Sequence, residues 1–155
     1  MGNSKIRQTL GFILSKTYSK TTFQELLEYV TYHDSYWIGS FTNPYLEYIL
    51  IIQLDAFWNR TYSEYDEQKQ EWPFSIIKIG SVASVRYKVY DNSTAATISS
   101  TESELVEGIA ITQFNDIYGG LIEFTHQPDI AVLLMSEQGE YLNANPKDTV
   151  EKFTG

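Results

Sequence analysis

Three closely spaced glutamates, Glu102, Glu104 and Glu107, are of a residue type and arrangement that could do chemistry. Paired carboxylates about 5–10 Å apart in a cleft lined with aromatic rings carry out glycoside hydrolysis. These glutamates flank a predicted turn, and Asp66-Glu67 lies in a tyrosine-rich segment, so the ingredients of such a site are present. No spacing selects a pair, however, and a charge run on a loop is usually a solvated face. We therefore favour a solvated acidic face over a catalytic pair, and carboxylate-pair catalysis is the one enzymatic alternative that the sequence leaves open.

A second group of interest is the aromatic and acidic segment from Trp58 to Trp72. Tryptophan and tyrosine dominate the energetic centres of protein interfaces, and carboxylates steer a basic partner toward them. The alternative is that the rings cover a sheet edge while the acids face solvent. The predicted partner-binding residues of both groups are Trp58, Tyr62, Glu64, Tyr65, Asp66, Glu67, Glu71, Trp72, Glu102, Glu104 and Glu107.

Other patterns of catalysis or metal binding are missing from the sequence. It contains no cysteine, no phosphate-binding glycine loop and no nucleophile elbow. Its two histidines, His33 and His126, are each predicted at the end of a helix, where histidine commonly interacts with free carbonyl groups. We therefore predict that the protein is not an enzyme and has no metal site and no cofactor.

The charge of the chain is uneven. The net charge is −9, yet the first 60 residues hold five acids and five bases. From Glu102 to Glu151 there are ten acids against Lys147 alone. Such a surface repels phosphate backbones and anionic lipid and attracts a cationic protein, so we expect no nucleic-acid partner and no membrane binding. The alternative is that the acidity only keeps the protein soluble.

The elements that position these residues belong to one predicted domain, residues 1–155, which is a common domain size. The lack of cysteine and of a secretory signal favours a cytoplasmic location. We expect a monomer or a weak homodimer.

Three helices are predicted in the outer parts of the chain. Thr22 and Glu25 form a capping box. About three helical turns follow, with one apolar face made of Phe23, Leu26, Leu27 and Val30. An apolar stripe predicts an earlier helix from Ser4 to about Lys16, and Asn145-Pro146 predicts the start of a terminal one.

Residues 44–58 are ambiguous between helix and strand. Asn43-Pro44 resembles a helix start, but every even position from Leu46 to Trp58 is apolar. The alternation predicts a long central strand, whose hairpin partner is Tyr36–Phe41.

Further strands are predicted at Phe74–Ile79 and Ser84–Tyr90, and a hairpin joins Ile130–Met135 to Tyr141–Ala144. Between them, an apolar stripe from Phe114 to Thr125 predicts a helix capped by Thr112, despite Gly119-Gly120. The predicted fold is therefore α+β, an antiparallel sheet of about five to seven strands with helices packed on one face.

The order of these features resembles that of bacterial immunity proteins against polymorphic toxins. It runs through TTFQELLEYV, YWIGSFTNPYLEYILIIQLDAFW, PFSIIKIG, SVRYKVYD and FNDIYGGLIEF. The resemblance implies a cytosolic inhibitor that masks the active site of a cationic toxin domain, often a nuclease. It carries over no individual functional residue.

Two other functions are compatible with the sequence. One is a small-molecule-binding or sensory domain with a cavity between sheet and helices. The other is an acidic mimic of DNA, which the balanced charge of the first 60 residues disfavours.

Overall fold

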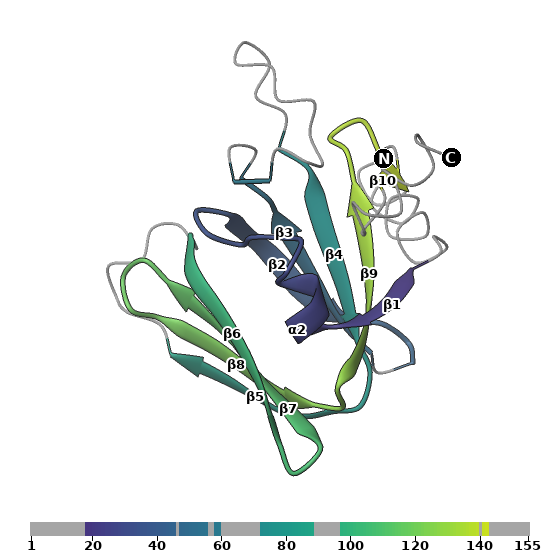
Figure 1. Cartoon of the computed structure of the whole chain (residues 1–155), viewed down its shortest axis with the longest axis vertical. Coiled ribbons are helices and arrows are strands. Elements are labelled where there is room, and N and C mark those ends of the chain that lie inside the picture. Colours follow the sequence, from purple (N-terminus) through teal and green to yellow (C-terminus); the bar gives the residue numbers. More distant parts are fainter. Residues whose placement is uncertain are drawn as a thin grey trace.

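Two antiparallel β-sheets make up nearly all of the described structure, and Figure 1 shows them as separate layers with one short helix between them. The computed structural model describes residues 18–45, 47–55, 58–59, 72–88, 97–139 and 141–142. Its elements are β1 (Ser19–Thr22), α2 (Phe23–Leu26), β2 (Tyr36–Thr42), β3 (Tyr48–Gln53), β4 (Phe74–Ile79), β5 (Val82–Lys88), β6 (Ile98–Val106), β7 (Ile109–Asp116), β8 (Leu121–His126), β9 (Asp129–Met135) and β10 (Tyr141–Leu142).

The predicted α+β fold is therefore wrong, since the described part is nearly all β. The large sheet has the order β1-β9-β4-β3-β2, and the short β10 also pairs with β9. The small sheet has the order β5-β8-β7-β6. The chain passes from one sheet to the other between β4 and β5 and between β8 and β9.

The main core lies between the two sheets. The large sheet contributes buried residues such as Leu50, Ile77 and Val132, and the small sheet contributes Phe114 and Phe124. The second sheet and this core thus occupy the place where the sensory-domain alternative expects helices and a cavity. Tightly packed side chains fill protein cores to the density of organic crystals, so this layer fixes the relative position of the two sheets.

The outer face of the large sheet carries a second, smaller cluster of buried residues: Ile49, Ile76 and Leu133. At its margin the Lys78 ammonium lies 4.7 Å from the centre of the Tyr18 ring. Burial, with a smaller contribution from a nearby carboxylate, raises the pKa of Tyr18 to about 12. The central strands of the large sheet are thus buried on both faces, which explains their continuous runs of isoleucine and leucine.

The first predicted helix is correctly started but far too long. The Thr22 hydroxyl accepts a hydrogen bond from the Glu25 amide at 3.2 Å, as the capping box predicts. The Glu25 carboxylate, however, accepts from the Thr21 hydroxyl at 3.1 Å. The helix ends at Leu26, after four residues. Of the predicted apolar face, Phe23, Leu26 and Val30 are buried in the core between the two sheets, and Leu27 is partly buried against it.

The predicted hairpin of β2 and β3 is confirmed, with a shorter second strand. β3 begins at Tyr48 because Asn43 builds the turn: its Oδ1 accepts from the amides of Tyr45 and Glu47, both at 3.0 Å. β4 has the predicted bounds Phe74–Ile79, and β9 pairs with β10 as expected.

The predicted helix over residues 112–125 is wrong, because this stretch forms the β7–β8 hairpin. Asp116 organises its turn: Oδ1 accepts from the amides of Tyr118 at 2.6 Å and Gly120 at 3.0 Å. Gly119 has a φ of 88°, which favours glycine. Gly120 packs against the Asp116 carboxylate and the Lys88 carbonyl, where a Cβ would overlap both. The two glycines therefore make the turn.

Two predicted helices, Ser4 to about Lys16 and the one starting at Asn145-Pro146, lie outside the described residues.

Candidate functional site

The outer face of the small sheet carries a polar row that crosses all four strands. The register places Glu102 beside Gln113, Gln113 beside Glu123, and Glu123 beside Arg86. Side chains directly opposite one another in antiparallel strands lie within contact distance. One face of the sheet thus gathers four polar side chains from β6, β7, β8 and β5.

The inner part of this row is internally satisfied. Glu123 Oε2 accepts hydrogen bonds from Gln113 Nε2 at 2.6 Å and from Arg86 Nη2 at 3.1 Å. Arg86 neutralises the Glu123 charge, and a carboxylate can only accept. The amide orientation of Gln113 is therefore fixed, with its nitrogen toward Glu123 and its Oε1 left as an acceptor.

The edge of the row is different, because Glu102 and Glu104 are both exposed. Neither carboxylate forms an ion pair or a side-chain hydrogen bond with any residue of the described part. They lie two residues apart on β6, about 7 Å along the strand. No cationic side chain of the described part pairs with these two carboxylates at the edge of the sheet.

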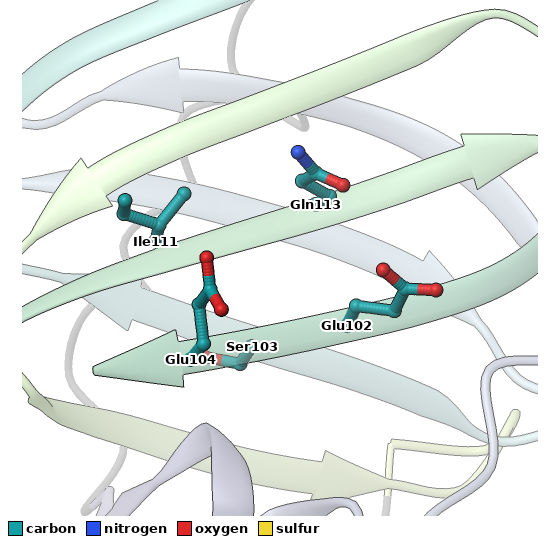
Figure 2. Close-up of a pocket in the computed structure, with 5 residues that line it drawn as sticks. All are labelled: Glu102, Ser103, Glu104, Ile111 and Gln113. Carbon is teal, nitrogen blue, oxygen red and sulfur yellow. The ribbon is translucent and has the colours of Figure 1, made fainter. Parts of the chain in front are cut away.

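A hollow of about 310 Å³ lies at these two carboxylates. Glu102, Ser103, Glu104, Ile111 and Gln113 line it. Figure 2 shows Glu102 and Glu104 projecting from one strand and Gln113 and Ile111 from its neighbour. Ile111 is half-buried and supplies apolar surface. The two carboxylates at the hollow can only accept hydrogen bonds, and Gln113 adds its Oε1 as a further acceptor.

Such a hollow fits the side chain of lysine or arginine. The cationic head would bind the carboxylates and the Gln113 oxygen, while the alkyl stem would pack on Ile111. Glu107, the third predicted acid, is exposed in the turn of the same hairpin with a φ of 52°. The structure thus brings the three glutamates to one hairpin. Glu102 and Glu104 lie on the strand and Glu107 lies in the turn itself, whereas we predicted that all three flank a turn.

The apolar end of this hairpin is also exposed. Leu105 is 54 % exposed and Val106 46 %. In Figure 1 the β6–β7 hairpin reaches beyond the other strands at the lower edge of the molecule. Apolar contact area next to a charged rim is the usual composition of a protein interface.

The described residues of the predicted aromatic and acidic segment, Trp58 and Trp72, lie away from this hollow, beside the start of β2. Trp58 is 50 % exposed, and its Nε1 donates to Asp34 Oδ2 at 3.1 Å. His33 Nδ1 lies 3.0 Å from the same oxygen, and its ring packs edge-on against Trp58. Asp34 has a φ of 61°, in the left-handed region. The prediction that His33 ends a helix is wrong, since α2 ends at Leu26.

Trp72 joins the same end of the large sheet. Its ring stacks on Tyr36, with centroids 5.3 Å apart and an angle of 11° between the planes. Its amide donates to Glu137 Oε1 at 2.6 Å. Because Trp72 is half-buried in this stack, part of its ring covers the sheet, as the alternative interpretation expected. The predicted site residues Tyr62, Glu64, Tyr65, Asp66, Glu67 and Glu71 lie outside the described residues.

A buried polar chain runs through the small sheet on its inner side. His126 Nδ1 lies 2.6 Å from the Gln127 carbonyl oxygen, which can only accept, so Nδ1 carries the proton. His126 Nε2 therefore accepts from the Thr112 hydroxyl at 2.9 Å, and Thr112 accepts in turn from the Ser103 hydroxyl at 2.8 Å. Burial lowers the pKa of His126, which disfavours the charged form of the ring. The predicted helix-end role of His126 is wrong.

Sequence reasoning missed Ile111 and Gln113, the residues that complete the hollow. A signal for them existed in Glu107-Gly108, a two-residue turn between two runs of β-forming residues. A hairpin with this two-residue turn places Glu102 opposite Gln113 and Glu104 opposite Ile111, and the structure has the same pairs.

The fold and this face define a class of structure: a two-sheet β protein with an acidic, acceptor-lined outer face. Comparison with protein-family models, with curated proteins and with solved structures gives no match. Within the described ranges, no group of three or more histidine and carboxylate residues is arranged to hold a metal ion. No helix in the described part is long and apolar enough to cross a bilayer.

Proposed function

We propose that this protein is an inhibitory binding protein of the immunity type, which binds a basic protein domain through the outer face of the small sheet. The observation that carries the proposal is the hollow lined by the Glu102 and Glu104 carboxylates, which can only accept hydrogen bonds. Two unneutralised carboxylates beside an apolar wall favour a lysine or arginine from a partner over any anion.

The surrounding surface supports the same kind of ligand. Val106 offers exposed apolar area on the same face as the carboxylates, Leu105 offers it on the other face of the same strand, and Glu107 adds a third negative charge at the turn. Charged rims raise the association rate and set specificity, whereas apolar contacts supply much of the affinity. A basic toxin domain, with its active site covered by this hairpin, fits both requirements.

The test is complex formation with the product of the gene immediately upstream, measured by size-exclusion chromatography and titration calorimetry. The double variant Glu102→Gln/Glu104→Gln should bind at least about tenfold more weakly and with a smaller salt dependence. Glu28→Gln is the matched control, because it removes an exposed carboxylate near α2 and should leave the affinity unchanged. An absent complex, or one that the double variant forms with wild-type affinity, contradicts the proposed function.

A further inference from the structure

The strand β6 lies at the edge of the small sheet, and its hairpin turn determines which backbone groups point outward. Glu107 and Gly108 both have positive φ, 52° and 80°, so they form a type I′ turn. The pair that flanks such a turn, Val106 and Ile109, exchanges hydrogen bonds. By alternation, Glu104 and Glu102 bond toward β7, and the backbone groups of the residues between them point away from the sheet.

A contact from outside the sheet confirms this assignment. Gln24 Nε2 donates to the Ser103 carbonyl at 3.4 Å, and Gln24 belongs to α2. Gln24 is itself exposed, and the contact is at the limit of hydrogen-bond length, so an incoming strand can displace it. In the described part, this is the single hydrogen bond to the outward backbone groups of Thr101, Ser103 and Leu105.

The beginning of the same edge already accepts an antiparallel segment. The Asp34 amide donates to the Ile98 carbonyl, and the Ile98 amide donates to the Ser35 carbonyl, both at 2.8 Å. Tyr36 and Thr97 form an antiparallel bridge next to them. The register of β6 against β7 shifts between Ile98 and Ser100, directly after these contacts. Among the described residues, no other strand pairs with the outward side of the rest of β6.

The negative charges of Glu102 and Glu104 determine which kind of strand can pair with the outward edge of β6. Two copies of this chain, pairing antiparallel about Ser103, would place Glu102 of each copy opposite Glu104 of the other. Like charges directly opposite are destabilising, and these positions are non-hydrogen-bonded pairs, where side chains approach most closely. The edge therefore disfavours a second copy. An extended segment with lysine or arginine at every second position would instead place each positive charge against a glutamate.

We propose that the outward edge of β6, from Thr101 to Leu105, binds an extended basic segment of the partner as a fifth strand of the small sheet. This inference rests on the proposed function and specifies its binding mode, β-strand addition. The alternate side chains of the added strand pack on Leu105 and the inner side of the sheet, while its basic side chains reach Glu102 and Glu104.

The experiment titrates the ¹⁵N-labelled full-length chain with a capped peptide of alternating lysine and valine, followed by amide shifts and amide hydrogen exchange. The outward amides of Ser103 and Leu105 should shift, and their exchange should slow on binding. A peptide of alternating glutamate and valine is the control and should leave them unchanged. Absence of shift and protection at these two amides with the lysine peptide overturns strand addition.

A matched pair of variants separates the backbone from the charge. Leu105→Pro removes an outward amide without touching the ladder to β7, a position where edge strands tolerate proline. Leu105→Ala shortens the same side chain and keeps the amide. Leu105→Pro should bind the lysine peptide about tenfold more weakly than Leu105→Ala, with circular dichroism confirming that both fold.

The outcomes distinguish this inference from the proposed function. If Leu105→Pro and Leu105→Ala bind equally while Glu102→Gln/Glu104→Gln loses binding, strand addition is refuted and the acidic face remains the binding site. In addition, Glu102→Lys/Glu104→Lys should reverse the peptide preference from lysine to glutamate. A variant that still prefers the lysine peptide contradicts both the strand addition and the charge argument.

Discussion

The buried chain from Ser103 through Thr112 to His126 makes a quantitative prediction for Thr112→Val. Valine has nearly the shape of threonine, so the substitution opens no cavity but removes one donor and one acceptor. His126 Nε2 then has no partner in a site where His126 is 1 % exposed and Thr112 is fully buried. Leaving a buried acceptor unsatisfied costs about 1–3 kcal/mol.

We expect Thr112→Val to lower the free energy of unfolding by about 2 kcal/mol. The half-buried Ser103 hydroxyl, which also loses its partner, can turn to water and adds little. Urea unfolding at about pH 8, where His126 is neutral in both states, measures the loss, and the denaturant dependence m should not change. Thr125→Val is the matched control, because Thr125 directly precedes His126 in β8 and its side chain lies on the opposite face of the sheet. This substitution should change the free energy of unfolding by less than about 0.5 kcal/mol.

A double-mutant cycle tests the cause of the loss. His126→Phe removes the acceptor that Thr112→Val leaves unpaired and keeps an aromatic ring against Phe23, whose centroid lies 5.5 Å from that of His126. The double variant should therefore be less destabilised than the sum of the two single variants. If Thr112→Val lies within about 0.5 kcal/mol of the wild type, or if the two effects simply add, the directed hydrogen-bond chain is refuted.

Three further predictions follow from single positions. Burial lowers the pKa of His126, so the unfolded chain binds a proton more readily than the folded one. The free energy of unfolding should therefore be steady above the ordinary histidine pKa of about 6.5 and should fall as the pH drops through it toward the lower folded pKa. Urea titrations at successive pH values measure this fall, and His126→Phe should remove it. The Thr101 hydroxyl is buried and has no hydrogen-bond partner among the described residues, so Thr101→Val should leave the melting temperature unchanged or raise it. A clear decrease would show that the hydroxyl is satisfied. Gly120→Ala should lower the free energy of unfolding by about 1–3 kcal/mol in urea, because the added Cβ displaces the Asp116 carboxylate that holds the turn. Gly39→Ala is the control and should be nearly neutral, because no described atom lies within 4 Å of the added Cβ. Equal effects of the two substitutions would contradict this account of the turn.

The strands of the large sheet could be predicted from the sequence because both their signals and their packing are simple. The even positions Leu50, Ile52 and Leu54 are all in the main core, as the alternation predicted, and Phe74–Ile79 has the predicted bounds. These residues are apolar and β-branched or long, so the hydrophobic period and the strand propensity agree.

The small sheet was misread because its buried face contains polar residues. Ser103, Thr112 and His126 satisfy one another by hydrogen bonds, so they can occupy inward positions of β6, β7 and β8. In the sequence they interrupt the apolar alternation of the three strands, and the remaining apolar residues then fit a helical stripe by chance. Such side-chain networks depend on contacts far apart in the chain, which no local pattern encodes.

The sequence predicts the acidity of this part of the chain, but it does not predict which carboxylates are left without a basic partner in the sheet. Its acidity belongs to the C-terminal part of the chain, as the sequence indicates. Yet Glu123 is neutralised by Arg86, so the unbalanced charge of this face falls on Glu102, Glu104 and Glu107 at one exposed hairpin. An edge strand must avoid pairing with copies of itself, and charged side chains achieve this. If the proposed function is correct, the same three carboxylates also make the edge selective for a basic strand, so that one arrangement of charge would serve both protection against self-association and recognition of a cationic partner.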